Sequence, residues 1–217
     1  MKQWRQVMKK ITLAFVGATL FGAFATTNAL AQSEPIIFVH GYSGSTSNFD
    51  TMVNRFTASG YAPSKLYRFG YNSLLYSDKT SAGQLGNFVN IVRANNGSAA
   101  VSIVAHSNGG LVSRWYRAKL GGTSAMRRFV TLGTPHKGTQ TAYACYSAAC
   151  YDMRPGSIFL LQLAGAGCDR SLWSNNDGVI IPAANAQCGT NVQTASVGHL
   201  ALLTDSSVYN QTRDQLR

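Results

Sequence analysis

The chain has 217 residues and a formal net charge of +11, from 19 Lys and Arg against 8 Asp and Glu. It is 45% hydrophobic and only 12% charged, which excludes a disordered or coiled-coil protein, and no solenoid-type repeat is visible. Net charge alone identifies no partner. Because the sequence has no arginine-rich run and no recognition motif, we expect no binding to nucleic acid.

The first 31 residues are predicted to be a secretory signal peptide. Four basic residues within 1–10 precede an uncharged stretch of 15 residues, and a small-residue cleavage site follows at Ala29-Leu30-Ala31. A membrane anchor is the alternative, but a stretch this short and interrupted by glycine does not suit a bilayer. Removal of residues 1–31 leaves 32–217, a single domain of 186 residues with a formal charge of +7. We therefore expect a secreted protein with no permanent membrane span, and the periplasm is the alternative compartment.

Apolar periodicity alternates between strands and helices along the mature chain. In chain order it predicts a strand at 35–39, a helix at 48–59, a strand at 65–69, a helix at 80–94, a strand at 99–104, a helix at 111–120 and a strand at 127–132. The signal then weakens, with one helix at 157–163 and a last strand at 192–195. Parallel neighbours need crossover connections, so the alternation indicates an α/β fold with a mostly parallel central sheet and helices on both faces. The segment 136–170 would form either a small cap or a decorated edge.

All four cysteines, Cys145, Cys150, Cys168 and Cys188, lie in the exported portion, where an even count indicates two disulfides. Four cysteines allow three pairings, and closeness in sequence favours Cys145–Cys150 and Cys168–Cys188. A zinc site is the competing interpretation. The cysteine spacing is not that of a zinc knuckle, and no histidine lies near the cysteines at ligand spacing, so we predict no metal.

One serine lies where a sharp strand-to-helix turn is predicted. Ser107 stands in Ala105-His106-Ser107-Asn108-Gly109-Gly110, between the strand at 99–104 and the helix at 111–120. Such a turn pushes the serine hydroxyl out above the sheet edge, which suits a nucleophile. The small-x-Ser-x-Gly pattern is weak evidence by itself, and an ordinary turn is the alternative. The flanking strand and helix are what favour the nucleophile.

A nucleophilic serine needs a general base and an acid that orients the base. On this kind of strand–turn–helix scaffold the chain order is serine, acid, histidine. Only His136 and His199 follow Ser107, and no carboxylate lies between Ser107 and His136, which leaves His199 as the base. The carboxylates in the remaining interval are Asp152, Asp169 and Asp177. Asp177 is favoured because it lies in a turn-forming loop that can aim at an imidazole, and the Cys168–Cys188 bridge is expected to hold that loop.

The tetrahedral intermediate of acyl transfer needs two backbone N–H donors for its oxyanion. One usually belongs to the residue after the nucleophile and the other to the loop after the first strand, which points to Asn108 and Tyr42. Tyr42 directly follows His40-Gly41, and Gly44 gives this loop the freedom to curl toward the serine. The alternative is that Tyr42 is only a loop aromatic residue.

With these motifs the chain resembles the small secreted bacterial lipases of the α/β-hydrolase superfamily, both the minimal lipases of bacilli and the class 2 lipases. The matching stretches are Val39-His40-Gly41-Tyr42, Ala105-His106-Ser107-Asn108-Gly109-Gly110, Thr131-Leu132-Gly133-Thr134-Pro135-His136, Asp177-Gly178-Val179 and Gly198-His199-Leu200. The resemblance implies a triacylglycerol lipase or esterase that acts through an acyl-enzyme, needs no cofactor and uses His40 and His136 structurally. Larger lipases of this kind often hold calcium, but Asp152, Asp169 and Asp205 are too scattered to predict a ligand set.

The expected partner is an acyl ester or lipid at a micelle or emulsion surface, and we expect the enzyme to be a monomer. The apolar candidates for the acyl pocket are Tyr42, Phe49, Trp115, Trp173 and Leu200. Because 186 mature residues leave little material for a lid, we expect activity on short and medium esters. A polyester depolymerase, a phospholipase or an acyltransferase would share the same three residues, and a catalytically silent fold used for surface binding is the alternative from another class.

Overall fold

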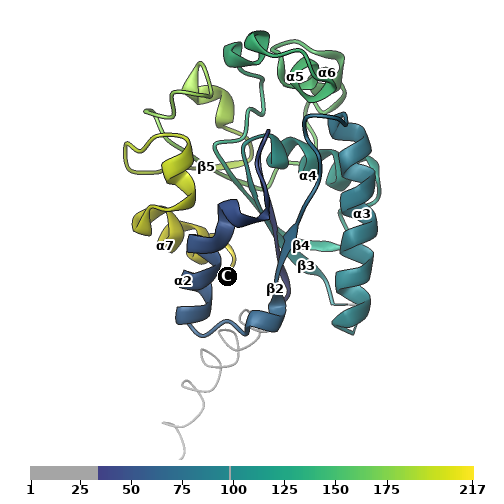
Figure 1. The fold of residues 1–217 in the computed structure, drawn as a ribbon, viewed down its shortest axis with the longest axis vertical. Coiled ribbons are helices and arrows are strands. Elements are labelled where there is room, and N and C mark those ends of the chain that lie inside the picture. The colour runs from purple at the N-terminus through teal and green to yellow at the C-terminus, as the bar shows by residue number, and fades with distance from the viewer. Residues whose placement is uncertain (1–33, 98) are drawn as a thin grey trace, which may run out of the picture.

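The computed structural model describes residues 34–97 and 99–217, so the predicted signal peptide lies outside the described residues. None of the helices described is both long and apolar enough to span a bilayer. The centre is a sheet of six strands in the order β2-β1-β3-β4-β5-β6, and every neighbouring pair is parallel (Figure 1). The strands are β1 (Ile36–Val39), β2 (Leu66–Phe69), β3 (Val101–His106), β4 (Met126–Leu132), β5 (Arg170–Trp173) and β6 (Thr190–Gln193).

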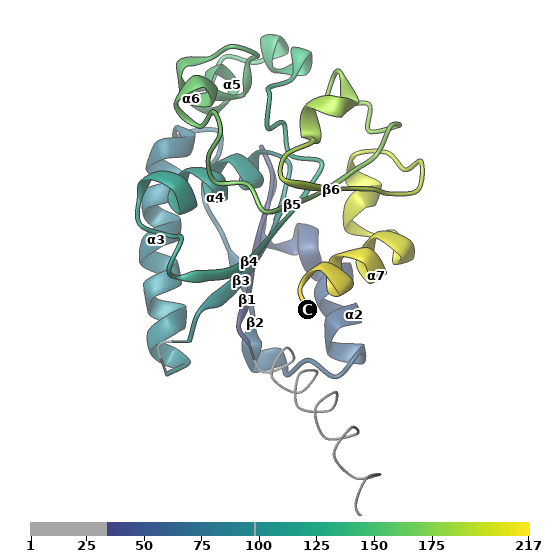
Figure 2. The same cartoon turned by 180° about the vertical axis from the view of Figure 1, so that it is seen from behind.

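Helices cover both faces of this sheet, as a comparison of Figures 1 and 2 shows. On one face pack α2 (Asp50–Ala58) and α7 (Ser206–Gln215), and on the other pack α3 (Asp78–Asn95) and α4 (Asn108–Lys119). Alternate residues of β1 are buried in the two cores, Ile36 and Phe38 in the first and Ile37 and Val39 in the second. This two-sided burial explains the uninterrupted apolar run of the strand. The predicted α/β fold with helices on both faces is confirmed.

The direction of strand addition reverses beside β1. β2 pairs with one edge of β1, and β3 pairs with the other. The chain leaves β1 toward α2 and leaves β3 toward α4, on opposite faces of the sheet. Open α/β sheets bind ligands in the crevice that such a reversal creates at the carboxyl ends of the strands. The loops after β1 and β3, which carry Tyr42 and Ser107, meet at that place.

Periodicity locates the first four strands closely, and α6 (Ile158–Gln162) agrees with the helix predicted at 157–163, but the other late elements are located poorly or not at all. β6 (Thr190–Gln193) begins two residues before the predicted strand at 192–195. β5, α5 (Ala148–Met153) and α7 were not predicted. β5 has four residues and buries Ser171, so it has no apolar run, and α7 buries only Val208, Tyr209 and Thr212. Elements with so few large apolar residues carry too little periodicity to be recognised in a sequence.

The segment 136–170 lies at the carboxyl end of the sheet, where α5 and α6 (Ile158–Gln162) stand above α3 and α4 in Figure 2. It also contains the short helix η3 (Gln140–Ala144). The segment has a small core of its own, formed with Leu111 of α4 by Ala142, Met153, Phe159, Leu160 and Leu163. The buried Arg114 of α4 donates hydrogen bonds to the carbonyls of His136 (3.1 Å), Leu163 (2.6 Å) and Ala166 (2.8 Å). These bonds fix the segment against the fold beside the strand reversal.

Both disulfides have the pairing that closeness in sequence favoured. Cys145 is bonded to Cys150 and Cys168 to Cys188, with Cα–Cα distances of 5.8 Å and 5.7 Å. The first bridge lies within 136–170, and the second joins the residues just before β5 and β6. The second bridge therefore closes the Asp177 loop at its base.

We predict that replacing Cys168 and Cys188 together by serine lowers the free energy of unfolding by about 3 kcal/mol, and that the Cys145/Cys150 pair costs about 2 kcal/mol. The larger loop gains more conformational entropy in the unfolded chain once it is opened. Urea denaturation of the two double variants measures both values. A larger loss for the Cys145/Cys150 variant would contradict the prediction.

Candidate functional site

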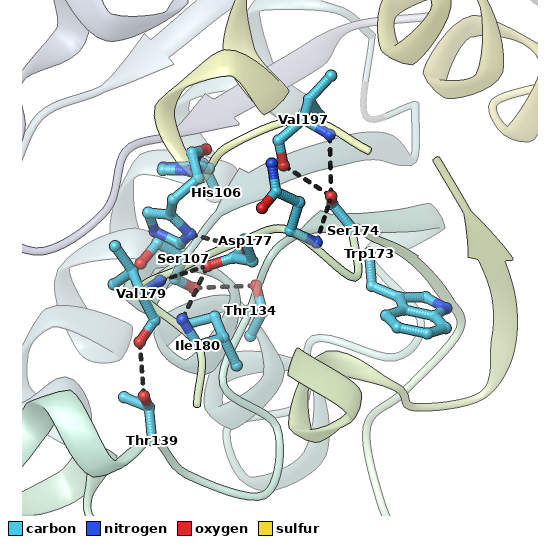
Figure 3. Close-up of polar contacts among 12 residues, drawn as sticks. His106, Ser107, Thr134, Thr139, Trp173, Ser174, Asp177, Val179, Ile180 and Val197 are labelled. Atoms are coloured by element: carbon cyan, nitrogen blue, oxygen red, sulfur yellow. Dashed lines mark hydrogen bonds and ion pairs between the residues drawn. The ribbon is translucent and has the colours of Figure 1, made fainter. Parts of the chain in front are cut away.

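Ser107 lies at the tip of the turn between β3 and α4. Its backbone has φ 52° and ψ −131°, a left-handed conformation that costs a non-glycine residue about 1–3 kcal/mol. The Ser107 amide donates to the Leu132 carbonyl at 2.9 Å, and the Thr134 hydroxyl donates to the Ser107 carbonyl at 2.9 Å. β4 and the residues after it thus hold the strained turn in place, as Figure 3 shows for Thr134.

Glycine is required next to this turn because α4 begins against the end of β1. A Cβ atom at Gly109 would lie 2.2 Å from the His40 carbonyl oxygen and 2.6 Å from that of Val39. The close approach brings the first turn of α4, with the Asn108 amide, next to the loop that carries Tyr42. The first N–H groups of a helix have no acceptor within the helix and are available to a ligand.

The side chains of Asp177 and His199 are joined by a hydrogen bond of 2.8 Å between Asp177 Oδ2 and His199 Nδ1. Asp177 follows β5 and His199 follows β6, and the His199 amide also donates to the Asp177 carbonyl at 3.0 Å. Both side chains are buried, with 3% and 7% of the residue exposed. A hydrogen on Nδ1, donated to the carboxylate, leaves Nε2 as the nitrogen that can accept a proton.

The Asp177 loop is fixed by hydrogen bonds on both sides (Figure 3). On one side, the Ser174 hydroxyl donates to the Val197 carbonyl at 2.6 Å and accepts from the Val197 amide at 3.1 Å. On the other side, the Thr139 hydroxyl donates to the Val179 carbonyl at 2.7 Å. These bonds join the acid loop to the His199 loop and to the segment 136–170.

The environment keeps Asp177 ionised. Burial pushes its pKa upward, but hydrogen bonds from His199 and from the amides of Ile180 and Val179 outweigh burial and hold the pKa below its ordinary value. The two amides donate to Asp177 Oδ1 at 2.7 Å and 3.0 Å, while Oδ2 is bonded to the imidazole. An ionised carboxylate in this position can stabilise a positive charge on His199.

A second histidine, His106, lies against the first. Its Nε2 donates to the His199 carbonyl at 3.1 Å, and the two rings are 4.5 Å apart. Burial, together with the neighbouring His199, lowers the pKa of His106 to about 3. His106 is therefore neutral in the physiological range and supports the backbone of His199 without competing for its proton.

Two cavities meet at Ser107. The first, of about 380 Å³, is lined by His199, His106, Asn48 and the 41–44 loop, together with Leu200 and Leu203. The second, of about 230 Å³, is lined by residues of the 139–153 segment, including Thr139, Ala142, Ala144 and Met153. Tyr42, Ser107 and Val179 line both cavities. His199 lines only the first of the two.

The residues that the sequence predicted for the site thus lie together at one end of the sheet. The two aspartates that were not favoured as the acid have other partners. Asp169 pairs with Arg170 at 2.7 Å, and Asp152 accepts a hydrogen bond from the Asp78 amide at 2.9 Å.

Among the proposed acyl-pocket residues, Tyr42 and Leu200 line the cavities. Three others were wrong: Phe49 is buried in the core, Trp115 packs against Phe159, and Trp173 lies on β5. The positions of Phe49 and Trp115 depend on how the elements pack, which composition does not reveal.

Gly133 is a residue of the site that sequence analysis missed. It follows β4 with φ +55°, and a Cβ atom there would lie 2.8 Å from Asp177 Oδ2 and 3.2 Å from His199 Nδ1. The acid–base pair packs directly on its α-carbon. The signal available in the sequence was the position of Gly133 immediately after a strand, at the end where the candidate residues gather.

One potential metal-ligating group occurs among the residues that the structure describes. His136, Cys168 and Cys188 place their ligand atoms within 4.8 Å of one another, although His136 is distant from both cysteines in sequence. The two sulfur atoms are joined in a disulfide, so neither is available as a thiolate ligand. His136 Nε2 is instead hydrogen-bonded to the Thr131 hydroxyl at 3.0 Å. Burial lowers the pKa of His136 well below its ordinary value, as suits a neutral ring inside the fold.

The sequence around Tyr42 and Ser107 matches a known protein family. The sequence matches the family model described as lipase (class 2) over residues 33–155, more than half of the chain. The chain belongs to the class 2 lipases. The matched range includes Tyr42, Ser107 and Asn108 and ends before Asp177 and His199. As a class 2 lipase, the protein is a carboxylic ester hydrolase of the lipase and esterase kind.

Solved structures share the fold of this class 2 lipase at low sequence identity. The mature lipase BlEst2 of Bacillus licheniformis is 20% identical with a TM-score of 0.75, and the match covers 84% of this chain and 91% of that one. Lipase B of Aspergillus fumigatus is 15% identical with a TM-score of 0.69, over 84% of this chain and 52% of that one. The phospholipase PlaB of Legionella pneumophila is 13% identical with a TM-score of 0.65, over 84% and 61%. All three confirm an α/β-hydrolase architecture.

We predict that Gly133→Ala lowers kcat for ester hydrolysis by about a hundredfold, because a methyl group would separate Asp177 from His199 and small displacements of catalytic groups cost that much. The matched control is Gly121→Ala. Gly121 has φ +78° and no atom within 4 Å of an added Cβ, so that variant carries similar backbone strain far from the site. Equal losses of kcat in both variants would contradict the prediction.

Proposed function

We propose that this class 2 lipase hydrolyses acyl esters with a catalytic triad of Ser107, His199 and Asp177. The observation that carries the proposal is the buried hydrogen bond between Asp177 Oδ2 and His199 Nδ1, beside a cavity lined by both His199 and the strained Ser107. A buried carboxylate that orients an imidazole toward a serine is the arrangement that acyl transfer requires. Sequence order and the strand–turn–helix position of Ser107 support the same assignment.

The mechanism follows from the positions of these groups. Ser107 Oγ attacks the ester carbonyl carbon while His199 Nε2 takes the hydroxyl proton, and Asp177 stabilises the imidazolium that forms. The carbonyl oxygen becomes an oxyanion that accepts hydrogen bonds from the Tyr42 and Asn108 amides. The intermediate collapses, His199 returns the proton to the leaving alcohol oxygen, and an acyl-Ser107 ester remains. Water then attacks this ester by the same proton transfers and releases the carboxylic acid.

Each of the two cavities is assigned to one part of the ester substrate. The leaving oxygen must lie within reach of His199, which lines only the larger of the two. The alcohol part therefore leaves through the 380 Å³ cavity, and the acyl chain occupies the 230 Å³ cavity against the 139–153 segment. Ala142 and Met153 give this second cavity an apolar floor.

Apolar side chains at the mouth support a role on ester aggregates. Val179 and Leu200 line the first cavity and are 40% and 68% exposed, and Ile181, two residues after Val179, is 44% exposed. Exposed apolar residues that surround a site mark contact with an apolar surface. The proposed substrate is thus an acyl ester or lipid in a micelle or emulsion.

We further propose that the enzyme is exported and that 32–217 is its single catalytic domain. Two disulfides support an oxidising compartment, because cytosolic proteins rarely keep them. N-terminal sequencing of the protein recovered from medium and periplasm of an expressing bacterium tests this proposal. A mature chain that begins at Gln32 is expected, and a full-length cytoplasmic protein would contradict it.

We predict that Ser107→Ala abolishes turnover of p-nitrophenyl esters from acetate to palmitate and of an emulsified triglyceride, because no nucleophile remains. The matched control is Ser102→Ala, which removes a buried hydroxyl from β3, the strand that leads to Ser107. Activity of the control with none in Ser107→Ala supports the triad. Ester turnover by folded Ser107→Ala, or none by the wild type on any ester, would refute the proposed function; parallel assays on phospholipid and polyester film rank the substrate classes.

We predict that Ala144→Leu lowers kcat/KM about tenfold for octanoate relative to acetate, because the added side chain occupies the acyl cavity. Ala144 is exposed at the cavity wall, so the larger residue can be accommodated without disturbing the core. Ala148→Leu is the matched control, since Ala148 is also exposed but does not line the cavity. An unchanged chain-length profile in Ala144→Leu would place the acyl chain elsewhere.

A further inference from the structure

A buried carboxyl group lies behind the oxyanion site. Asp78 is the first residue of α3 and is fully buried. Its Oδ1 accepts a hydrogen bond of 2.8 Å from Nδ2 of Asn108, which is also fully buried. In the proposed mechanism the backbone N–H of Asn108 donates a hydrogen bond to the oxyanion. The Asp78 side chain therefore holds the side chain of an oxyanion donor from behind.

The chain just before Asp78 contacts the loop that carries Tyr42, the other proposed oxyanion donor. The Tyr71 hydroxyl donates to the His40 carbonyl at 2.9 Å, and the rings of Tyr71 and His40 stack 4.4 Å apart. The Ser43 amide donates to the Ser73 hydroxyl at 2.8 Å. His40 and Ser43 bracket the Gly41-Tyr42 dipeptide. The chain from Tyr71 to Asp78 thus braces both loops that supply the oxyanion donors.

We propose that Asp78 is a positioning residue for ester hydrolysis, which fixes the Asn108 amide at the oxyanion site through its hydrogen bond to the Asn108 side chain. The proposal rests on the proposed function of Ser107 and Asn108. Asp78 touches no reacting atom, and its effect passes through Asn108. Because an oxyanion donor contributes through its placement, a small displacement of Asn108 weakens transition-state binding more than substrate binding.

The charge state of Asp78 suits this role. Burial raises its pKa well above the ordinary value, the nearby Asp152 of α5 raises it further, and the bond from Asn108 only partly opposes them. Asp78 Oδ2 has no hydrogen-bond partner among the described residues, which leaves it as the oxygen that carries the proton. The other titratable neighbour is the half-buried Tyr71, whose own pKa is raised well above its ordinary value by the loss of solvent around its hydroxyl. A neutral carboxyl group can position Asn108 without placing a negative charge behind the developing oxyanion.

The test compares Asp78→Ala and Asp78→Asn with the wild type. Asp78→Ala removes the acceptor, whereas Asp78→Asn keeps a neutral carbonyl oxygen of the same size. The matched control is Asp50→Ala, which removes the exposed aspartate at the first position of α2. For each variant, kcat and KM for p-nitrophenyl butyrate are measured per active site, counted by titration with a p-nitrophenyl phosphonate. Inhibition by an alkylboronic acid, which forms a tetrahedral adduct with the serine, reports on the oxyanion site directly.

We expect Asp78→Ala to lower kcat by about tenfold to a hundredfold with KM changed less than about twofold. The affinity for the boronic acid should fall by a similar factor. Asp78→Asn should restore kcat to within about threefold of the wild type, and Asp50→Ala should match the wild type.

Three results would overturn the proposal: unchanged kcat and boronate affinity in Asp78→Ala, a rise in KM that accounts for the whole loss, or an Asp78→Asn variant as impaired as Asp78→Ala. Because activity is counted per titrated site, partial unfolding does not imitate the expected result. Failure of the proposed function is separate, since it appears as activity in Ser107→Ala or as no activity in the wild type.

Discussion

The structure depends on the close approach of α4 to the end of β1. Gly109 lies against the His40 carbonyl, where an added Cβ would be only 2.2 Å away, so the two elements can meet there only through a residue without a side chain. This contact places the helix amide after the serine beside the loop after the first strand. It also fixes the sharp turn whose strain costs about 1–3 kcal/mol, which the packing of the surrounding core must offset. The position of Ser107 where the two cavities meet and the approach of the first turn of α4 to the Tyr42 loop both depend on this arrangement.

Hydrogen-bond partners decide the direction of the pKa shifts of the buried carboxyl groups around Ser107. Asp177 and Asp78 are both buried carboxyl groups, yet their pKa values shift in opposite directions. Asp177 receives two amide N–H groups and an imidazole, which together outweigh the cost of burial. Asp78 accepts one hydrogen bond from the side-chain amide of Asn108 and lies near the carboxyl group of Asp152, so the effect of burial on its pKa dominates. The direction of each shift agrees with the proposed role, since a low pKa favours an ionised Asp177 and a raised pKa favours a neutral Asp78.

The segment 136–170 connects the fold to the smaller cavity at Ser107. Arg114 attaches it to α4 through three carbonyls, and Thr139 attaches it to the Asp177 loop. The segment supplies most of the wall of the smaller cavity at Ser107. Of the two interpretations that the sequence left open, a cap or a decorated edge, the structure supports a fixed wall beside the serine. A wall held in this way suits the proposed role of the smaller cavity, which is to hold the acyl chain.

Much of the protein could be predicted from the sequence. The apolar runs determined the strands from β1 to β4, because strands buried on both faces must be apolar throughout. Chain order and the scarcity of histidines and carboxylates selected Ser107, Asp177 and His199. The sequence placed Gly133 directly after a strand but could not reveal its contact with Asp177 and His199. It could not reveal the Asp78–Asn108 bond, the burial of Phe49 or the packing of Trp115 on Phe159 either. Each of these depends on which residues distant in sequence face one another, and that was decided by the packing of β4, β5, α3 and the 136–170 segment in the tertiary structure.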